Sequence, residues 1–200
     1  MQNLLIGVTG SVASIKLPLL VEELVKKNKY NIKIVTTESA KHFYKDYIQK
    51  NTDGLYLTVG NSEIEINIYD DKYEWESWNK IGDPVQHIEL RKWTSLFLIA
   101  PLDANTLAKI ANGMCDNLLT SILRAWDIED QSKKIIIAPA MNTLMWNNPF
   151  TQEHLIVLKQ KLNVQIIEPT SKLLACGDLG VGAMASVDTI VEMVQLNLNK

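Results

Sequence analysis

Small and hydroxyl-bearing residues follow four short apolar runs of the sequence. They lie in residues 9–14 (TGSVAS), in Thr36, Thr37 and Ser39, in residues 101–106 (PLDANT) and in residues 138–142 (APAMN). Hydroxyl groups, and the backbone N–H groups at the start of a helix, can bind a phosphate or the edge of a ring. Any one of these loops could be an ordinary cap or turn. Four together at one edge of a sheet would favour a nucleotide-like ligand.

That ligand is not expected to be a dinucleotide. Gly7 and Gly10 do not form a Gly-x-Gly-x-x-Gly pattern, because the loop has no third glycine. Glu38 could still bind the ribose of NAD, but its neighbours Thr37 and Ser39 supply neutral donors suited to a single phosphate. The two cysteines, Cys115 and Cys176, have no metal-binding spacing, so no metal site is predicted.

The elements that must position these loops alternate along the chain. Apolar runs predict buried parallel strands at residues 4–8, 32–35, 96–99, 135–137 and 164–167. Stretches of helical period lie at residues 17–25, 105–111, 118–126, 155–162 and 187–196. This alternation predicts one α/β domain over residues 1–200, a doubly wound parallel sheet of Rossmann-like or flavodoxin-like type with helices on both faces. In such a sheet, ligands bind beyond the carboxyl ends of the strands, where the four loops fall.

Three local features refine this picture. Asn148-Pro149 is typical of a helix start, and Gly113 stands where a helix end favours a left-handed residue. Pro18 would kink a helix that began at Ser11. Residues 51–85 are rich in Asn, Asp, Glu, Trp and Tyr, and we interpret them as an excursion or hairpin within the domain.

Composition narrows the class of function. The chain has 200 residues, 46% of them hydrophobic, and a formal net charge of −3. A negative balance disfavours general nucleic-acid binding and favours a small-molecule partner. Residues 4–8 are too short for a secretory signal, and no apolar run approaches the roughly 18 residues of a membrane span. With only two cysteines, a cytoplasmic location is the expectation.

Five segments resemble the flavoprotein family of cysteine decarboxylases. They are residues 10–13 (GSVA), 78–90 (WNKIGDPVQHIEL), 100–127, 139–146 (PAMNTLMW) and 175–184 (ACGDLGVGAM). They follow the family's order and cover most of the chain. Two features depart from the family: Asp103 stands where many relatives have serine, and residues 58–68 look longer than the corresponding loop.

The resemblance implies an activity and a cofactor. The activity is FMN-dependent decarboxylation of phosphopantothenoylcysteine to phosphopantetheine, on the route to coenzyme A, through oxidation of the thiol-bearing carbon, loss of CO2 and re-reduction. It also implies a homotrimer with FMN at the subunit interface. The implied FMN contacts are Gly10, Ser11, Val12, Ser39, Phe43, Asp103, Ala104, Asn105, Thr106 and Ala140.

Four further residues receive roles from the resemblance. His87 is the expected base or electrostatic partner, because imidazole exchanges protons near neutral pH. Asn142 is expected to bind the substrate carboxylate through its amide NH2, with Met145 shaping the pocket. Cys176 is expected to donate a proton to the ene-thiolate, since a thiol is mostly protonated at pH 7. Each residue also has a purely structural alternative. His87 could be an ordinary histidine at the edge of an element, and Asn142 could be a turn cap. Cys115 is expected to be a small buried side chain.

Three other functions compete with this one. A peptidyl-cysteine decarboxylase is disfavoured by residues 78–90, and a flavin-prenylating enzyme by the presence of His87, Asn142 and Cys176. The third is an inhibitory subunit of a protein phosphatase on the same fold. Such regulators tend to carry long acidic tails, whereas this chain ends at Lys200, soon after its last predicted helix.

Overall fold

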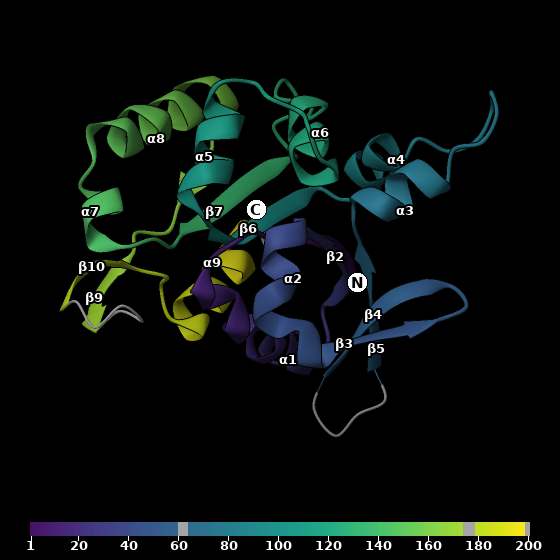
Figure 1. Ribbon diagram of the computed structural model, residues 1–200, viewed down its shortest axis with the longest axis horizontal. Coiled ribbons are helices and arrows are strands. Elements are labelled where there is room, and N and C mark those ends of the chain that lie inside the picture. The colour runs from purple at the N-terminus through teal and green to yellow at the C-terminus, as the bar shows by residue number, and fades with distance from the viewer. Residues whose placement is uncertain (60–63, 174–178, 199–200) are drawn as a thin grey trace.

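A sheet of eight strands forms the centre of the molecule (Figure 1). The computed structural model describes residues 1–59, 64–173 and 179–198. Within them the strand order is β3-β4-β5-β2-β1-β6-β7-β8, and β9 and β10 form a separate two-stranded sheet. The strands are β1 (Gln2–Val8), β2 (Tyr30–Thr36), β3 (Ile48–Asn51), β4 (Gly54–Val59), β5 (Ile64–Tyr69), β6 (Leu96–Leu102), β7 (Lys134–Pro139), β8 (Gln165–Ile166), β9 (Thr170–Leu173) and β10 (Leu179–Ala183).

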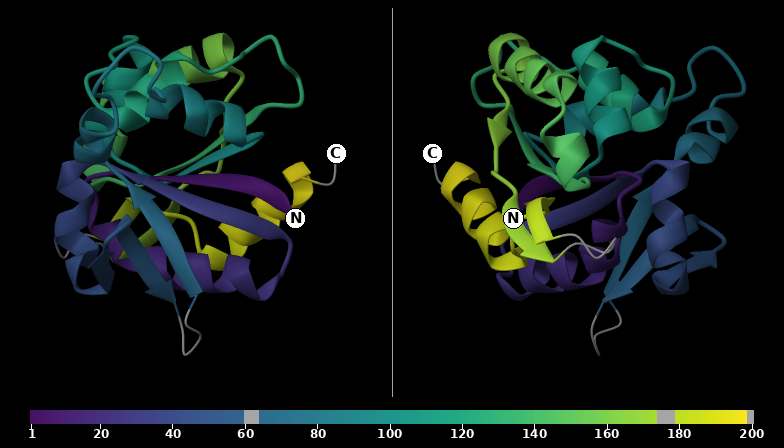
Figure 2. Two further views of the ribbon diagram at one scale, coloured as in Figure 1. Left: turned by 90° about the vertical axis from the view of Figure 1, so that its right-hand side faces the viewer. Right: turned by 60° about the vertical axis from the view of Figure 1, so that its left-hand side comes forward.

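Helices cover both faces of this sheet (Figure 2). Helices α1 and α9 pack on one face, and α5, α6 and α8 pack on the other. The helices are η1 (Val12–Lys16), α1 (Leu17–Lys26), α2 (Glu38–Tyr44), η2 (Lys45–Tyr47), α3 (Asp71–Glu76), α4 (Gln86–Trp93), α5 (Ala104–Ala111), α6 (Leu118–Arg124), α7 (Thr143–Trp146), α8 (Pro149–Leu162) and α9 (Val187–Leu198). The predicted doubly wound α/β fold is therefore confirmed.

The middle of the sheet is parallel and one edge is antiparallel. Strand β1 pairs in parallel with β2 and β6, and the parallel order continues through β7 to β8. On the other side β5 lies parallel to β2, while β4 and β3 add to it in antiparallel fashion. The segment 51–85 therefore contributes a hairpin to the same sheet and then helix α3, an antiparallel extension that the prediction of a parallel sheet did not include.

Strand β1 is buried on both faces. Leu4 and Ile6 belong to the cluster that contains α1 and α9, whereas Leu5 belongs to the cluster beneath α5 and α6. All three are fully buried. Burying such a side chain stabilises the fold by roughly 1.5–3 kcal/mol, which explains why the run is continuously apolar and does not alternate.

Caps fix where three helices begin or end. Asn148 Oδ1 accepts the Phe150 N–H (3.1 Å), with Pro149 in the first turn of α8. Gly113 has φ +70° just after α5, as its position indicated. Pro18 does not kink a helix, because η1 ends at Lys16 and α1 begins at Leu17, which places the proline in the first turn.

Candidate functional site

Thr9 connects the loop after β1 to the loop after β6. Its Oγ1 accepts the backbone N–H of Asp103 (2.7 Å) and donates to the carbonyl of Pro101 (2.9 Å). The Thr9 carbonyl in turn accepts the Ser14 hydroxyl (2.8 Å). Thr9 is completely buried, so these bonds form away from water. Two of the four loops selected from the sequence are thus held together by one side chain.

Gly10 brings a third loop into the same place. A side-chain carbon at Gly10 would lie 2.5 Å from Ser39 Oγ and 3.0 Å from Asp103 Oδ2. The loops after β1, β2 and β6 therefore meet at a point that only glycine can occupy. Ser39 also lies 3.2 Å from Thr37 through their hydroxyl oxygens. The junction combines neutral hydroxyl donors with a single carboxylate.

Asp103 caps helix α5. Its Oδ1 accepts the backbone N–H of Thr106 (2.7 Å), which is the bond that a serine at this position would also make. The departure from serine therefore preserves the local structure. Of the next residues, Ala104 is half-buried, Asn105 is exposed and Thr106 is buried.

Three other expected cofactor contacts lie on η1 and α2. Ser11 caps η1 by accepting the Ala13 N–H (3.3 Å), and Val12 follows it with its side chain exposed. Phe43 lies on α2, where its ring meets the ring of His42 edge-on. These residues flank the junction of Gly10, Ser39 and Asp103.

The loop after β7 carries Asn142 to the same edge of the sheet. The N–H of Ala140 donates to the carbonyl of Leu102 (2.9 Å), which joins this loop to β6. Asn142 caps α7, with its Oδ1 accepting the Leu144 N–H (2.8 Å). Because the carboxamide oxygen is committed to the cap, the direction of its NH2 group is set. Met145 is half-exposed on the following turn.

Strand β10 packs closely against this loop. The N–H of Met141 donates to the carbonyl of Gly182 (2.9 Å). A side-chain carbon at Gly182 would overlap the Met141 carbonyl oxygen, and one at Gly180 would overlap the Thr143 hydroxyl. The two glycines therefore allow close packing, whereas the sequence alone suggested only flexibility. Cys176 lies outside the described residues.

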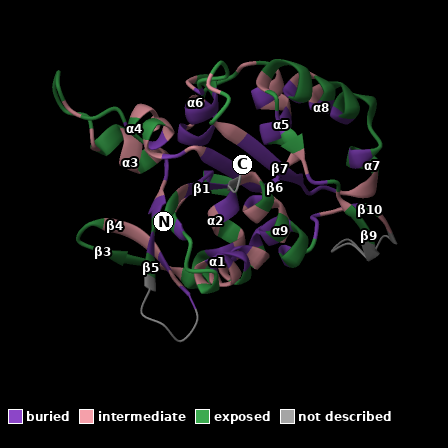
Figure 3. Cartoon of the chain, turned by 180° about the vertical axis from the view of Figure 1, so that it is seen from behind, coloured by how far each residue is buried: buried purple, intermediate pink, exposed green. Residues whose placement is uncertain are grey.

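His87 lies elsewhere in the chain. It is in the first turn of α4, and its Nδ1 contacts Glu74 Oε1 of α3. Helices α3 and α4 lie at the opposite side of the molecule from α7, β9 and β10 (Figure 1). The loop between them, residues 77–85, projects and is largely exposed (Figure 3). One chain therefore does not bring His87 and Asn142 together.

A group of charges fixes the start of α3. Asp70 caps α3 through the Tyr73 N–H (2.9 Å) and pairs with Lys41 of α2 (2.8 Å). Asp71 Oδ1 accepts the Leu118 N–H at the start of α6 (2.7 Å). Burial raises the pKa of Asp71, partly offset by that hydrogen bond. Nothing in the local sequence pattern indicated these partners, which lie up to 47 residues apart.

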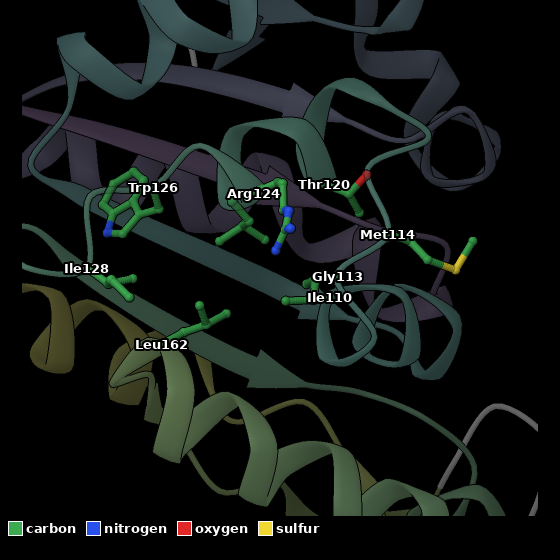
Figure 4. Close-up of a pocket in the computed structure, with 9 residues that line it drawn as sticks. Ile110, Gly113, Met114, Thr120, Arg124, Trp126, Ile128 and Leu162 are labelled. Carbon is green, nitrogen blue, oxygen red and sulfur yellow. The ribbon is translucent and has the colours of Figure 1, made fainter.

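A separate pocket of about 140 Å³ lies between α5, α6 and α8 (Figure 4). Its walls include Ile110, Trp126 and Leu162, with the exposed side chain of Arg124. None of the expected site residues lines it. Its exposed neighbour Cys115 follows Met114 between two helices, so the expectation of a buried thiol there was wrong.

The parts of the chain that the structure describes contain neither a metal site nor a membrane-spanning helix. No group of three His, Cys, Asp or Glu side chains could hold a metal ion. None of the described helices has both the length and the apolar character needed to cross a bilayer.

The comparisons with known proteins agree with the fold. The Flavoprotein family model matches residues 1–199, and the chain belongs to that family. It is 47% identical over 198 residues to phosphopantothenoylcysteine (PPC) decarboxylase of Mus musculus, covering 99% of this chain and 88% of the mouse protein.

Two solved structures are also similar. One is a cysteine-to-serine mutant of PPC decarboxylase complexed with pantothenoylaminoethenethiol, with TM-score 0.85, 45% identity, and coverage of 100% of this chain and 99% of the other. The second is the FMN binding protein AtHal3, with TM-score 0.79 and 46% identity; the match covers 98% of this chain and 95% of AtHal3.

Proposed function

We propose that this protein catalyses the FMN-dependent decarboxylation of phosphopantothenoylcysteine to phosphopantetheine, a step in coenzyme A synthesis. The observation that carries the proposal is near full-length similarity to PPC decarboxylases, together with the junction of Gly10, Ser39 and Asp103. The whole chain is proposed to act as one flavoprotein domain. A reducing, cytoplasmic compartment is part of the proposal and is supported by the exposed free thiol of Cys115.

The loop junction suits a flavin mononucleotide. The hydroxyl groups of Ser11 and Ser39 and the backbone of Gly10 offer neutral donors for a phosphate. The loop lacks the third glycine of the dinucleotide-binding pattern, which favours a mononucleotide. The proposed contacts remain Gly10, Ser11, Val12, Ser39, Phe43, Asp103, Ala104, Asn105, Thr106 and Ala140. When bound, FMN supplies the two-electron acceptor without which the carboxylate has no electron sink.

Asn142 is proposed to bind the substrate carboxylate. Its Oδ1 accepts the Leu144 N–H, which orients the carboxamide, and we propose that its NH2 group donates to the substrate carboxylate. An amide binds the carboxylate without a full counter-charge, which would stabilise the ground state and oppose loss of CO2. Met145 is proposed to shape the same pocket, and the Thr151 hydroxyl holds its carbonyl (2.5 Å).

A matched pair of substitutions tests the role of Asn142. Asn142→Asp keeps an oxygen for the cap but replaces the NH2 donor by a second acceptor. Asn148→Asp makes the same change at the equivalent cap of α8, where Asn148 accepts the Phe150 N–H. We expect KM to rise tenfold or more for Asn142→Asp and to stay unchanged for Asn148→Asp. A rise of this size corresponds to the loss of about one charge-assisted hydrogen bond. An unchanged substrate affinity in Asn142→Asp would exclude the role.

We propose that the complete site forms between subunits of a homotrimer. His87 and Asn142 lie on opposite sides of one chain, so a second copy must supply one of them. Exposed apolar side chains flank both places: Trp75, Trp78 and Ile81 near His87, and Leu144 and Phe150 near Asn142. Large exposed apolar groups of this kind mark surfaces that bind other proteins. Two different patches meeting give a head-to-tail contact, which forms a closed ring of three when each copy is rotated by a third of a turn from the last.

Complementation between inactive variants tests the shared site. His87→Asn and Asn142→Asp are co-expressed with different tags and purified as mixed assemblies. If each site uses His87 from one copy and Asn142 from its neighbour, mixed trimers regain about a third of the normal activity, because one of their three contacts joins an intact His87 to an intact Asn142. Mixed assemblies that stay inactive would place both residues in one chain. Light scattering on the unmodified protein then checks for three subunits.

Cys176 is proposed to donate a proton to the ene-thiolate carbon. The similar solved structure that carries a cysteine-to-serine change holds an ene-thiol compound, which supports a cysteine in this step. Cys176→Ser is expected to release an oxidised ene-thiol in place of phosphopantetheine, detected by mass spectrometry. Cys115→Ser is the matched control, because this exposed residue lies far along the chain from the Gly180 segment.

The most direct test of the whole proposal is spectroscopic and chemical. Purified protein should be yellow, and the cofactor released on denaturation should be FMN. Addition of phosphopantothenoylcysteine should then release CO2 and phosphopantetheine in equal amounts. A protein that is colourless and does not take up FMN on reconstitution would refute the proposal.

A further inference from the structure

Glu74 is the acidic partner of His87, and its surroundings set it apart from Glu76 on the same helix. Its Oε1 contacts His87 Nδ1, and both side chains are largely sheltered, with 13% and 28% of their surface exposed. Glu76 on the same helix is 68% exposed and pairs only loosely with Lys72 (3.6 Å). The contact between the Glu74 carboxylate and the His87 ring is therefore specific, unlike the solvent-exposed ion pair of Glu76.

We propose that Glu74 is a positioning residue for His87. The carboxylate accepts the Nδ1–H, selects the tautomer that is protonated at Nδ1 and leaves Nε2 as the ring nitrogen for proton transfer. This is the relationship in which a buried acid orients a catalytic imidazole without itself reacting. The inference rests on the proposed function, because it concerns the same histidine.

The anchoring of α3 gives Glu74 a fixed place from which to act. Asp70 caps the helix and pairs with Lys41, while Asp71 binds the start of α6 through the Leu118 N–H. Glu74 follows one turn later, so its backbone is held from two sides. The Lys41 pair also reaches α2, which begins at Glu38 beside the proposed FMN contact Ser39. His87 is therefore connected, through Glu74, α3 and Lys41, to the helix that carries Ser39 of the loop junction.

The loop between α3 and α4 does not itself hold the side chain of His87 in place. Residues 77–85 make their own local bonds, with Asp83 Oδ2 accepting the N–H groups of Asn79 and Lys80 (2.8 and 2.9 Å). The cap residue of α4, Val85, has no side-chain bond to the helix start. Among the described residues, Glu74 is the side chain that bonds the imidazole of His87.

The first experiment reads the tautomer directly and needs no turnover. The chain has three histidines, so ¹⁵N-histidine labelling gives few signals, and His87→Asn assigns those of His87. At about pH 8 we expect protonation at Nδ1 in the unmodified protein. Glu74→Gln has the same size but can donate to Nδ1, so the tautomer should shift toward protonation at Nε2. Glu76→Gln is the matched control and should leave the spectrum unchanged.

The second experiment measures turnover of the same variants. Glu74→Gln should lower kcat by about ten- to a hundredfold with little change in KM, and Glu76→Gln should change neither. Identical His87 tautomers in the unmodified protein and in Glu74→Gln would overturn the inference, whatever the activity. If instead His87→Asn keeps full decarboxylation, the histidine's role in the proposed function fails while the tautomer result stands independently.

Discussion

Thr9 Oγ1 lies 2.7 Å from the amide nitrogen of Asp103, and this bond joins the carboxyl ends of the neighbouring strands β1 and β6. Thr9→Val keeps the shape but leaves the Asp103 N–H and the Pro101 carbonyl without their partner. We expect a loss on the order of 1–3 kcal/mol in the free energy of unfolding, measured in urea, and weaker FMN binding. Thr9→Ser retains the hydroxyl and should behave almost normally. Equal stability of the Val and Ser variants would contradict the assigned bond.

Asp103 should be replaceable by the residue that many relatives carry. Asp103→Ser keeps an oxygen for the Thr106 N–H, so α5 stays capped and FMN binding should persist. Asp103→Ala removes the cap and should cost about 1 kcal/mol of stability. Thermal denaturation and FMN titration measure the two effects. If the Ser variant lost its FMN, the carboxylate itself would be needed for the cofactor.

Gly182 and Gly54 form a matched pair for testing how β10 packs. Both have nearly the same backbone angle, φ +133° and φ +134°. A side-chain carbon at Gly54 meets open space, whereas one at Gly182 overlaps the Met141 carbonyl oxygen. Gly54→Ala should cost about 1–3 kcal/mol from the backbone conformation alone. Gly182→Ala should cost clearly more and should raise KM, because it displaces the loop that carries Asn142.

The two effects separate in the measurement. Denaturant unfolding gives the cost of each substitution, and steady-state kinetics gives the effect on the substrate. Gly54→Ala should leave the kinetics unchanged. Equal costs for the two variants would show that the contact between Gly182 and Met141 adds nothing beyond backbone strain.

Asp71 predicts a pH dependence of stability. Because burial raises its pKa in the folded protein, the folded state binds more protons than the unfolded state above the ordinary value of 3.8. The contribution of Asp71 is therefore fully present below pH 3.8 and is lost as the pH rises through the folded pKa. Asp71→Asn keeps an acceptor for the Leu118 N–H and cannot titrate. The stability of the unmodified protein relative to Asp71→Asn should fall as the pH rises above 3.8.

The sequence predicted what depends on local pattern. Continuous apolar runs placed the parallel strands, because a strand buried on both faces has no polar side. The helix cap at Asn148 and the left-handed conformation of Gly113 could be predicted, because asparagine is favoured at helix starts and glycine just after helix ends. The four loops were predicted to share one sheet edge, and the bonds of Thr9 and Ala140, with the close approach of Ser39 to Gly10, confirm that they do. The roles of the individual site residues remain predictions.

What the sequence could not predict depends on partners far along the chain. The bond from Asp71 to Leu118 spans 47 residues and has no periodicity. Glu74 and His87 are 13 residues apart across an irregular loop, so spacing did not indicate their contact. The resemblance named His87 and Asn142 together, yet only the fold shows that one chain holds them apart. Helices α3 and α7, with six and four residues, are too short for a period to reveal them.

The antiparallel extension also determines how the sheet ends. Without β3, β4 and β5, strand β2 would present a row of unpaired amides beside buried side chains such as Ile34 and Val35. The sheet instead terminates in β3, four residues long, whose Gln49, Lys50 and Asn51 are exposed. A short polar border of this kind offers a poor template for edge-to-edge growth into aggregates. The antiparallel extension therefore replaces an apolar edge of the sheet by a short polar one, independently of any chemistry that the protein performs.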